Sequence, residues 1–321
     1  MSHSLQSGHG STREDGHEAA RTRDDSQAVH CRAPATCGEF VQGAVDGVDF
    51  LVNCPIDLYS NATAQPCSMA GLHLRNAGLH GKIAEAVDVA MRTQRGEHGP
   101  ATELRHTVSV TSEIPRGKGM ASSTADITAA LEAVCRSCHL ELTDEEFATI
   151  LTTVEPSDCV HFPGISHVNH LSGQLFETLP APRRMRALIV DCGGEVDTIG
   201  FDRDKARAIY RDNQPAIRCA LQALKLGLRS GDDRTVATAA TLSATLSQQI
   251  LRKPQFEELL AVAREHGAYG VNCAHSGTVL GVLHDDDEHS ADELADAVQR
   301  HFGRSVVMQG DYRVIGGGRH V

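Results

Sequence analysis

The segment that decides the fold of this chain reads PRGKGMASSTAD and runs from Pro115 to Asp126. Directly before it, residues 108–114 alternate between apolar and polar types, which predicts a β-strand. Directly after it, apolar residues recur at helical spacing, namely Ile127, Ala130, Leu131 and Val134. The sequence therefore predicts a strand, a loop rich in glycine and serine, and a helix that begins at the end of the loop.

A loop in this position offers the free backbone N–H groups of the first helical turn and the positive end of the helix dipole. Both favour an anion, so the segment predicts a phosphate site. Gly117 and Gly119 would let the backbone approach a phosphate, and Lys118 would add a point charge. The hydroxyls of Ser122 and Ser123 could cap the helix, donate to phosphate or bind Mg²⁺. The segment is neither a Walker A loop nor a dinucleotide fingerprint, and its residues alone leave an ordinary glycine turn open.

Composition narrows the class of protein. The chain has 321 residues, a formal net charge of −12 and 4% aromatic residues with no Trp, which favours an α/β or α+β enzyme and argues against a nucleic-acid partner. Its ten cysteines follow no signal-peptide pattern, and no apolar run reaches membrane-spanning length. We therefore expect free thiols, a cytoplasmic location and no membrane partner.

Further patterns predict the organisation of the chain. Residues 1–29 are too polar to fold and predict a disordered tail. Strands are expected at 50–56 and 188–190, and helices after the capping box at Thr143 and over 217–228, 239–250 and 256–263. Two prolines, Pro180 and Pro182, interrupt the pattern, so we expect an N-terminal domain at 30–182 and a C-terminal domain at 183–321.

The loop resembles the phosphate loop of the GHMP kinases, in the form Pro-x-x-x-Gly-Met-Ala-Ser-Ser-Thr-Ala. Residues 33–43 and 272–281 resemble the first and third motifs of that superfamily. This resemblance implies an α+β fold of two domains, an N-terminal domain like ribosomal protein S5 domain 2 and a C-terminal ferredoxin-like domain. It also implies ATP and Mg²⁺ as cofactors.

The resemblance assigns roles to individual residues. The ATP phosphate loop would consist of Pro115, Gly117, Lys118, Gly119, Met120, Ala121, Ser122, Ser123 and Thr124. Ser123 and Glu155 would hold Mg²⁺, and Asp158 would be the general base or orient the acceptor hydroxyl. Some relatives lack such a base, so that role stays open. On the substrate side the candidates are Glu39 and Gly277, and Asp57 is a second candidate for an ammonium group.

Within the superfamily the chain is most similar to kinases that phosphorylate L-threonine for cobalamin biosynthesis, through Pro34–Glu39, Cys54–Asp57, Lys118–Asp126, Glu155–Asp158 and Ala274–Gly277. The implied reaction converts L-threonine to O-phospho-L-threonine. Homoserine, a mevalonate-like acid, or a nucleotide-binding regulator without catalysis remain alternatives, and the oligomeric state, a homodimer included, stays open. The chain departs from many relatives at Thr36 and Cys37, where those relatives carry a basic residue, and Lys118 is a candidate to compensate.

Overall fold

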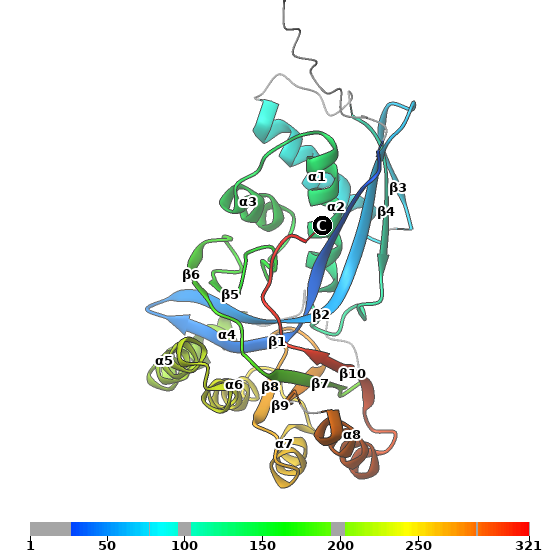
Figure 1. The fold of residues 1–321 in the computed structure, drawn as a ribbon. Helices are drawn as coiled ribbons and strands as arrows, with labels where there is room; N and C mark the ends of the chain where they lie inside the picture. Colours follow the sequence, from blue (N-terminus) through cyan, green and yellow to red (C-terminus); the bar gives the residue numbers. More distant parts are fainter. Residues whose placement is uncertain (1–26, 77, 96–103, 194–202, 287, 321) are drawn as a thin grey trace, which may run out of the picture.

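The structure is a computed structural model that describes residues 27–76, 78–95, 104–193, 203–286 and 288–320 (Figure 1). Its strands are β1 (Val29–Val45), β2 (Val48–Pro66), β3 (Gly71–Arg75), β4 (Arg105–Ser112), β5 (Ile165–Val168), β6 (Leu175–Leu179), β7 (Met185–Asp191), β8 (Gly270–Cys273), β9 (Val279–Asp285) and β10 (Val307–Arg313). Its helices are α1 (His80–Arg95), α2 (Ser122–Ser137), α3 (Asp144–Val154), α4 (Arg203–Asp212), α5 (Gln214–Ser230), α6 (Asp233–Ser247), α7 (Phe256–Glu265) and α8 (Glu288–Phe302).

One mixed sheet connects these elements, in the order β10-β7-β9-β8-β1-β2-β4-β3, with β5 and β6 attached to β2. The hairpin of β1 and β2 is its longest part, at 17 and 19 residues. Strand β1 pairs with β2 along its length and meets β8 where Glu39 lies opposite Cys273. Because β1 pairs with β2 on one side and with β8 on the other, it joins the two halves of the sheet and places residues near 39 beside residues near 273.

Strand β1 is irregular where these two halves meet. Register shifts occur between Pro34 and Ala35 and on both sides of Glu39. Gly38 has a φ of +54°, and a Cβ there would lie 2.6 Å from the backbone nitrogen of Ala274. Such bulges bend a strand and redirect its side chains, and they are frequent beside active sites. The first motif thus lies at a bend of β1.

Helices cover the sheet at both ends of the hairpin. Figure 1 shows α1, α2 and α3 gathered near one end, with α5 to α8 below the other. Helix α2 packs on β1 and β2, and α6 packs on β1 and β8. The main core runs through both regions, and a second apolar cluster lies between α7, α8 and strands β7 to β9. The C-terminal segment then returns along the molecule, with Gly317 opposite Gly164 and His320 opposite Arg32.

Most elements expected from the sequence are present. The apolar runs at 50–56, 108–114 and 188–190 lie largely within β2, β4 and β7, and the helices expected after residue 182 correspond to α5, α6 and α7. The capping box at Thr143 is formed, because Thr143 and Glu146 each accept the other's backbone N–H. The expected tail lies largely outside the described residues, and the sheet runs across 182, so the division into two domains stays a prediction.

The remaining expectations concern thiols and membranes. All ten cysteines lie among the described residues and are free. In the described part of the chain, no helix combines the length and the apolar character that crossing a bilayer requires.

Candidate active site

The predicted phosphate loop lies between the end of β4 and the first turn of α2. Its backbone has positive φ at Gly117 (+69°), Gly119 (+80°) and Ala121 (+56°), and Ala121 is the N-cap residue of α2. Among the described residues, no side chain caps this helix. The loop therefore delivers the chain to α2 through left-handed turns and leaves the first-turn N–H groups for a ligand.

The first and third motifs pack against this loop. The backbone N–H of Thr36 donates to the carbonyl of Met120 at 3.2 Å, and that of Thr278 donates to the carbonyl of Lys118 at 3.0 Å. A Cβ at Gly277 would lie 2.3 Å from the Lys118 carbonyl oxygen. Gly277 thus allows the turn between β8 and β9 to contact the phosphate loop.

Ser123 and Glu155 come together as the resemblance predicted. Ser123 is on the first turn of α2, Glu155 is the residue that ends α3, and the Ser123 hydroxyl donates to Oε1 of Glu155. The ammonium of Lys82, from the first turn of α1, lies 2.5 Å from the other oxygen of the same carboxylate. One carboxylate therefore joins α1, α2 and α3 beside the phosphate loop.

A second pair of acids lies next to this group. Glu39 is 5% exposed, and its Oε2 accepts the backbone N–H of His275 at 2.6 Å. Burial, and next the charge of Asp158, raise the pKa of Glu39 well above its usual range. Burial, and next the charge of Glu155, raise the pKa of Asp158 to about 6. Glu39, Asp158 and Glu155 therefore form one electrostatically coupled acidic cluster.

Lys118 points toward β7. Its Nζ lies 2.9 Å from Oδ2 of the buried Asp191, whose Oδ1 accepts the hydroxyl of Thr278 at 2.6 Å. Burial alone would raise the pKa of Asp191, but the hydrogen bonds from Thr278 and Lys118 lower it. Lys118 therefore ties the phosphate loop to β7, and its role as a charge for the phosphate stays a prediction.

Asp57 lies elsewhere. It is exposed on β2, and its Oδ1 accepts the backbone N–H of Arg313 at 2.8 Å. The structure thus supports Glu39 as the acid at the site and gives Asp57 a contact with β10 instead.

Several residues at the site carry no signal in the sequence. Lys82 lies in an ordinary amphipathic helix, and Asp191 ends an apolar strand. Lys253 is 4% exposed, and its ammonium donates to the carbonyl of Ala274 at 3.0 Å. This hydrogen bond holds the turn between β8 and β9 in place. The rings of His170 and His275 lie 5.3 Å apart between the loop after α3 and that turn. Only His275 lies inside a motif that the sequence singled out.

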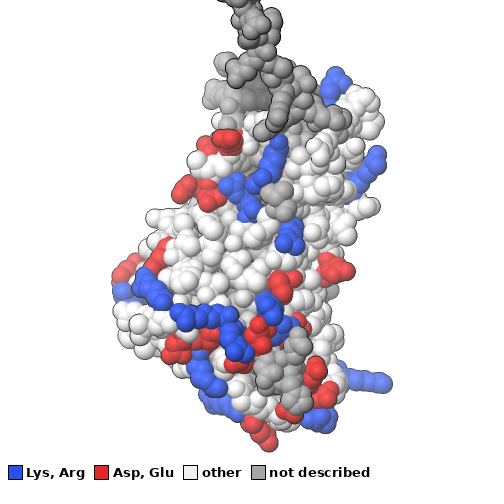
Figure 2. Space-filling model, in the orientation of Figure 1, with Lys and Arg blue, Asp and Glu red and all other residues white. Residues whose placement is uncertain are grey.

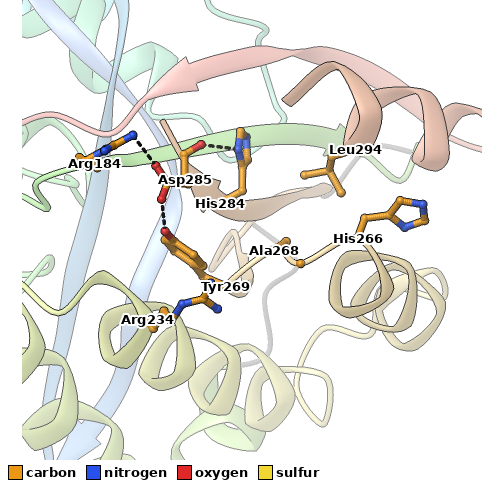
Figure 3. Close-up of a pocket in the computed structure, with 9 residues that line it drawn as sticks. Arg184, Arg234, His266, Ala268, Tyr269, His284, Asp285 and Leu294 are labelled. Atoms are coloured by element: carbon orange, nitrogen blue, oxygen red, sulfur yellow. Dashed lines mark hydrogen bonds and ion pairs between the residues drawn. The ribbon is translucent and has the colours of Figure 1, made fainter. Parts of the chain in front are cut away.

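A pocket of about 270 Å³ lies in another part of the molecule, between α6, α7, α8 and β9 (Figure 3). Its polar groups bind one another: Tyr269 donates to Asp285 at 2.5 Å, Arg184 pairs with Asp285 at 3.1 Å, and Arg234 lies over the Tyr269 ring. Its lining includes no residue of the phosphate loop. We therefore place the active site at the phosphate loop.

Charge on the surface agrees with a small ligand. On the face drawn in Figure 2, acidic and basic side chains of the described residues are mixed, and neither sign forms a continuous surface.

In the described part of the chain, no three His, Cys, Asp or Glu residues gather in a way that could hold a metal by themselves. A metal here would need oxygens from a ligand, which is how Mg²⁺ binds in sites for nucleotides.

Comparison with known proteins shows the family of this chain. The family model for the N-terminal domain of GHMP kinases matches residues 82–162, and the model for their C-terminal domain matches residues 220–304. The chain is 31% identical to an L-threonine kinase of Salmonella typhimurium over 274 residues, which are 85% of this chain and 88% of that protein. It is 30% identical to an L-threonine kinase of Citrobacter freundii over 263 residues, 82% of this chain and 88% of the relative.

Structural comparison gives the same fold. The crystal structure of homoserine kinase from Cytophaga hutchinsonii matches with a TM-score of 0.68 and 16% identity, covering 91% of this chain and 96% of that chain. The mixed sheet, the loop at the start of α2 and the two matched models agree with one another. The chain belongs to the GHMP kinase superfamily, whose members are ATP-dependent kinases of small molecules.

Proposed function

We propose that this kinase transfers the terminal phosphoryl group of ATP to the hydroxyl of L-threonine and forms O-phospho-L-threonine. The observation that carries the proposal is the similarity to two L-threonine kinases over more than 80% of the chain. The acidic pair of Glu39 and Asp158 beside the phosphate loop supports an amino acid as acceptor. The product would serve cobalamin biosynthesis, as the resemblance implies.

Mg²⁺ fits the residues that were predicted to hold it. Ser123 and Glu155 offer a hydroxyl and a carboxylate, both hard oxygen donors, and the two groups are in direct contact at the start of α2. The remaining ligands would be phosphate oxygens of ATP and water. When bound, the ion would neutralise charge on the phosphates during transfer.

The chain's own residues have the following roles in this proposal. The N–H groups of the first turn of α2 bind the phosphates of ATP. Asp158 accepts the proton of the threonine hydroxyl. The hydroxyl oxygen of threonine bonds to the terminal phosphorus of ATP, and the bond from that phosphorus to ADP breaks. Glu39, fixed by the backbone of His275, binds the ammonium of the amino acid, whose positive charge favours the ionised form of this buried carboxyl group.

The test is release of ADP by the purified protein with MgATP and, separately, L-threonine, L-serine, L-homoserine and mevalonate. We expect threonine to stimulate ADP release most strongly, in line with the similarity to two L-threonine kinases. Mevalonate should stimulate it least, because a site built for an ammonium group discriminates against an acceptor that lacks it. Ser123→Ala and Glu155→Gln should each lower kcat about 100-fold or more. Glu145→Gln, on the exposed side of α3, is the matched control and should retain activity.

Other outcomes point to other functions. Stimulation by homoserine or mevalonate in place of threonine would contradict the proposed acceptor and retain the kinase. ATP binding without turnover on any of the four acceptors would contradict catalysis and favour a nucleotide-binding regulator.

A further inference from the structure

Among the described residues, basic side chains at the phosphate loop include Arg116, Lys118 and Lys82, and the first two are paired with buried carboxylates. Arg116 pairs with Asp126 at 3.2 Å, and Lys118 pairs with Asp191 at 2.9 Å. The side chains of Asp126 and Asp191 are only 2% and 4% exposed, and each also accepts a hydroxyl from another strand or turn. Removing either cation would leave a buried charge uncompensated, so both pairs belong to the framework of the loop.

Lys82 is in a different situation. Its side chain is 43% exposed and that of Glu155 is 21% exposed, so this pair is accessible to water and to a ligand. Lys82 also lies in the first turn of α1, where the helix dipole disfavours a positive charge and where that turn holds no acidic residue. The structure thus keeps an accessible cation in a position that helix stability does not favour.

The start of α1 is packed on the phosphate loop. A Cβ on Gly78 would lie 1.8 Å from Nη1 of Arg116, so the segment leading into α1 touches the loop side chain directly. Lys82 and Ser123 bind opposite oxygens of the Glu155 carboxylate. The ammonium of Lys82 therefore lies at the same edge of α2 at which the phosphates would enter.

Mg²⁺ and the ammonium of Lys82 would compete for the carboxylate of Glu155. Under the proposed function, on which this inference rests, Glu155 would bind Mg²⁺ when MgATP enters. A carboxylate that binds a divalent cation attracts an ammonium less strongly. The phosphate oxygens of the entering ATP are strong partners for that ammonium. Phosphoryl transfer also spreads negative charge over the terminal phosphate oxygens, which a cation stabilises.

We propose that Lys82 is a catalytic residue that leaves Glu155 when MgATP binds and contacts the terminal phosphate. In the nucleotide-free enzyme its ammonium neutralises Glu155. In the complex it would add a positive charge beside Arg116 and Lys118, whose cationic groups are already paired with buried acids.

Calorimetric titration of the full chain with two nucleotides, each with Mg²⁺, tests this proposal. The nucleotides are the non-hydrolysable β,γ-imido analogue of ATP and ADP, which lacks the terminal phosphate. Lys82→Met should weaken binding of the imido analogue about 10- to 100-fold, because one charge-assisted hydrogen bond is lost, and change ADP binding less than about 3-fold. Lys82→Arg should restore most of the affinity for the imido analogue.

Arg92→Met is the matched control, because Arg92 is on the same helix, is 71% exposed and pairs only locally with Asp88 in the described structure. It should bind both nucleotides like the wild type. Equal weakening of both nucleotides by Lys82→Met would show that Lys82 only positions Glu155 and would overturn the proposal, as would unchanged binding of both. If Lys82→Met does not fold, Lys82→Gln replaces it. Failure of the wild type to bind either nucleotide would instead contradict the proposed function itself.

Discussion

Asp158 shows how a single side chain acquires chemistry from its surroundings. Burial and the neighbouring charge of Glu155 raise its pKa to about 6, so its carboxylate is a better proton acceptor than an exposed aspartate and is still ionised near neutral pH. The backbone carbonyl of Asp158 accepts the side-chain amide of Asn53 at 2.7 Å, which fixes the loop that carries it. These features support its proposed role as the general base.

The pH dependence of kcat/KM tests this role, because it reports pKa values of the free enzyme. Only ionised Asp158 can accept the proton, so kcat/KM should fall about tenfold per pH unit below about pH 6. Asp158→Asn should lower kcat by about 100-fold or more and remove this dependence. If Asp158→Asn retained kcat within about fivefold and kept the acid limb, positioning and electrostatics would carry the catalysis without a base.

The sequence alone revealed little about the roles of individual residues at the site. The pairing of Ser123 with Glu155 was predicted only through the resemblance, since 31 residues separate them in the sequence. Nothing marked Lys82, because a lysine next to the apolar stripe of a helix is usually an ordinary surface residue. The partner of Lys118 was equally hidden, since Asp191 reaches it only through the sheet.

At the level of elements, the site depends on close contact between the phosphate loop and the turn from β8 to β9. Gly119 and Gly277 make this contact, because a Cβ on either would fall within 2.4 Å of an atom of the other segment. The strand, loop and helix were readable from the sequence, since apolar spacing and glycine positions are local signals. The packing of the turn on the loop is a tertiary contact, which leaves no local signal in the sequence.

Gly277→Ala should separate these two segments. Its Cβ would meet backbone atoms, which cannot rotate away, so we expect a loss of stability of about 1–3 kcal/mol and about tenfold weaker ATP binding. Gly81→Ala is the control, because that glycine lies in α1 with no atom within 4 Å of the added Cβ and should not destabilise the fold. Thermal unfolding and nucleotide titration measure both effects, and equal behaviour of the two variants would contradict the proposed contact.

At the level of the whole molecule, the long hairpin brings the motifs together. Strand β1 places Glu39 beside Cys273, and α2 packs on the same two strands. Sequence patterns predicted most of the elements and the enzyme class but not the single sheet that joins them. Pairing between distant strands, such as β1 with β8, leaves no local periodicity, so it could not be derived from residue spacing.

Buried histidines link the stability of this fold to pH. His167 lies between the rings of Phe50 and Phe176, and burial lowers its pKa to about 4. His161 lies against the rings of Phe147 and Phe162, and burial lowers its pKa to about 3. Unfolding restores an ordinary pKa near 6.5, so the unfolded chain binds protons that the folded chain does not. Their contribution to stability is therefore complete above about pH 6.5 and is lost as the pH falls toward these lowered values.

Denaturant unfolding between pH 7 and 4.5 measures this effect. The wild type should lose stability on acidification, and His167→Phe should reduce that loss by about 2 kcal/mol because one titrating group is removed. The phenyl ring preserves the aromatic packing with Phe50 and Phe176. An unchanged pH dependence in the variant would show that His167 is not the group that binds a proton on unfolding.

Under the proposed function, this kinase makes O-phospho-L-threonine. Phosphorus NMR of a mixture of the enzyme, MgATP and L-threonine tests it most directly, because it identifies the product together with the loss of ATP. We predict a phosphomonoester signal that grows with that of ADP and is split by one proton, the single proton on the β-carbon of threonine. Formation of ADP with inorganic phosphate alone, or no change in ATP, would contradict the transfer of phosphate to threonine.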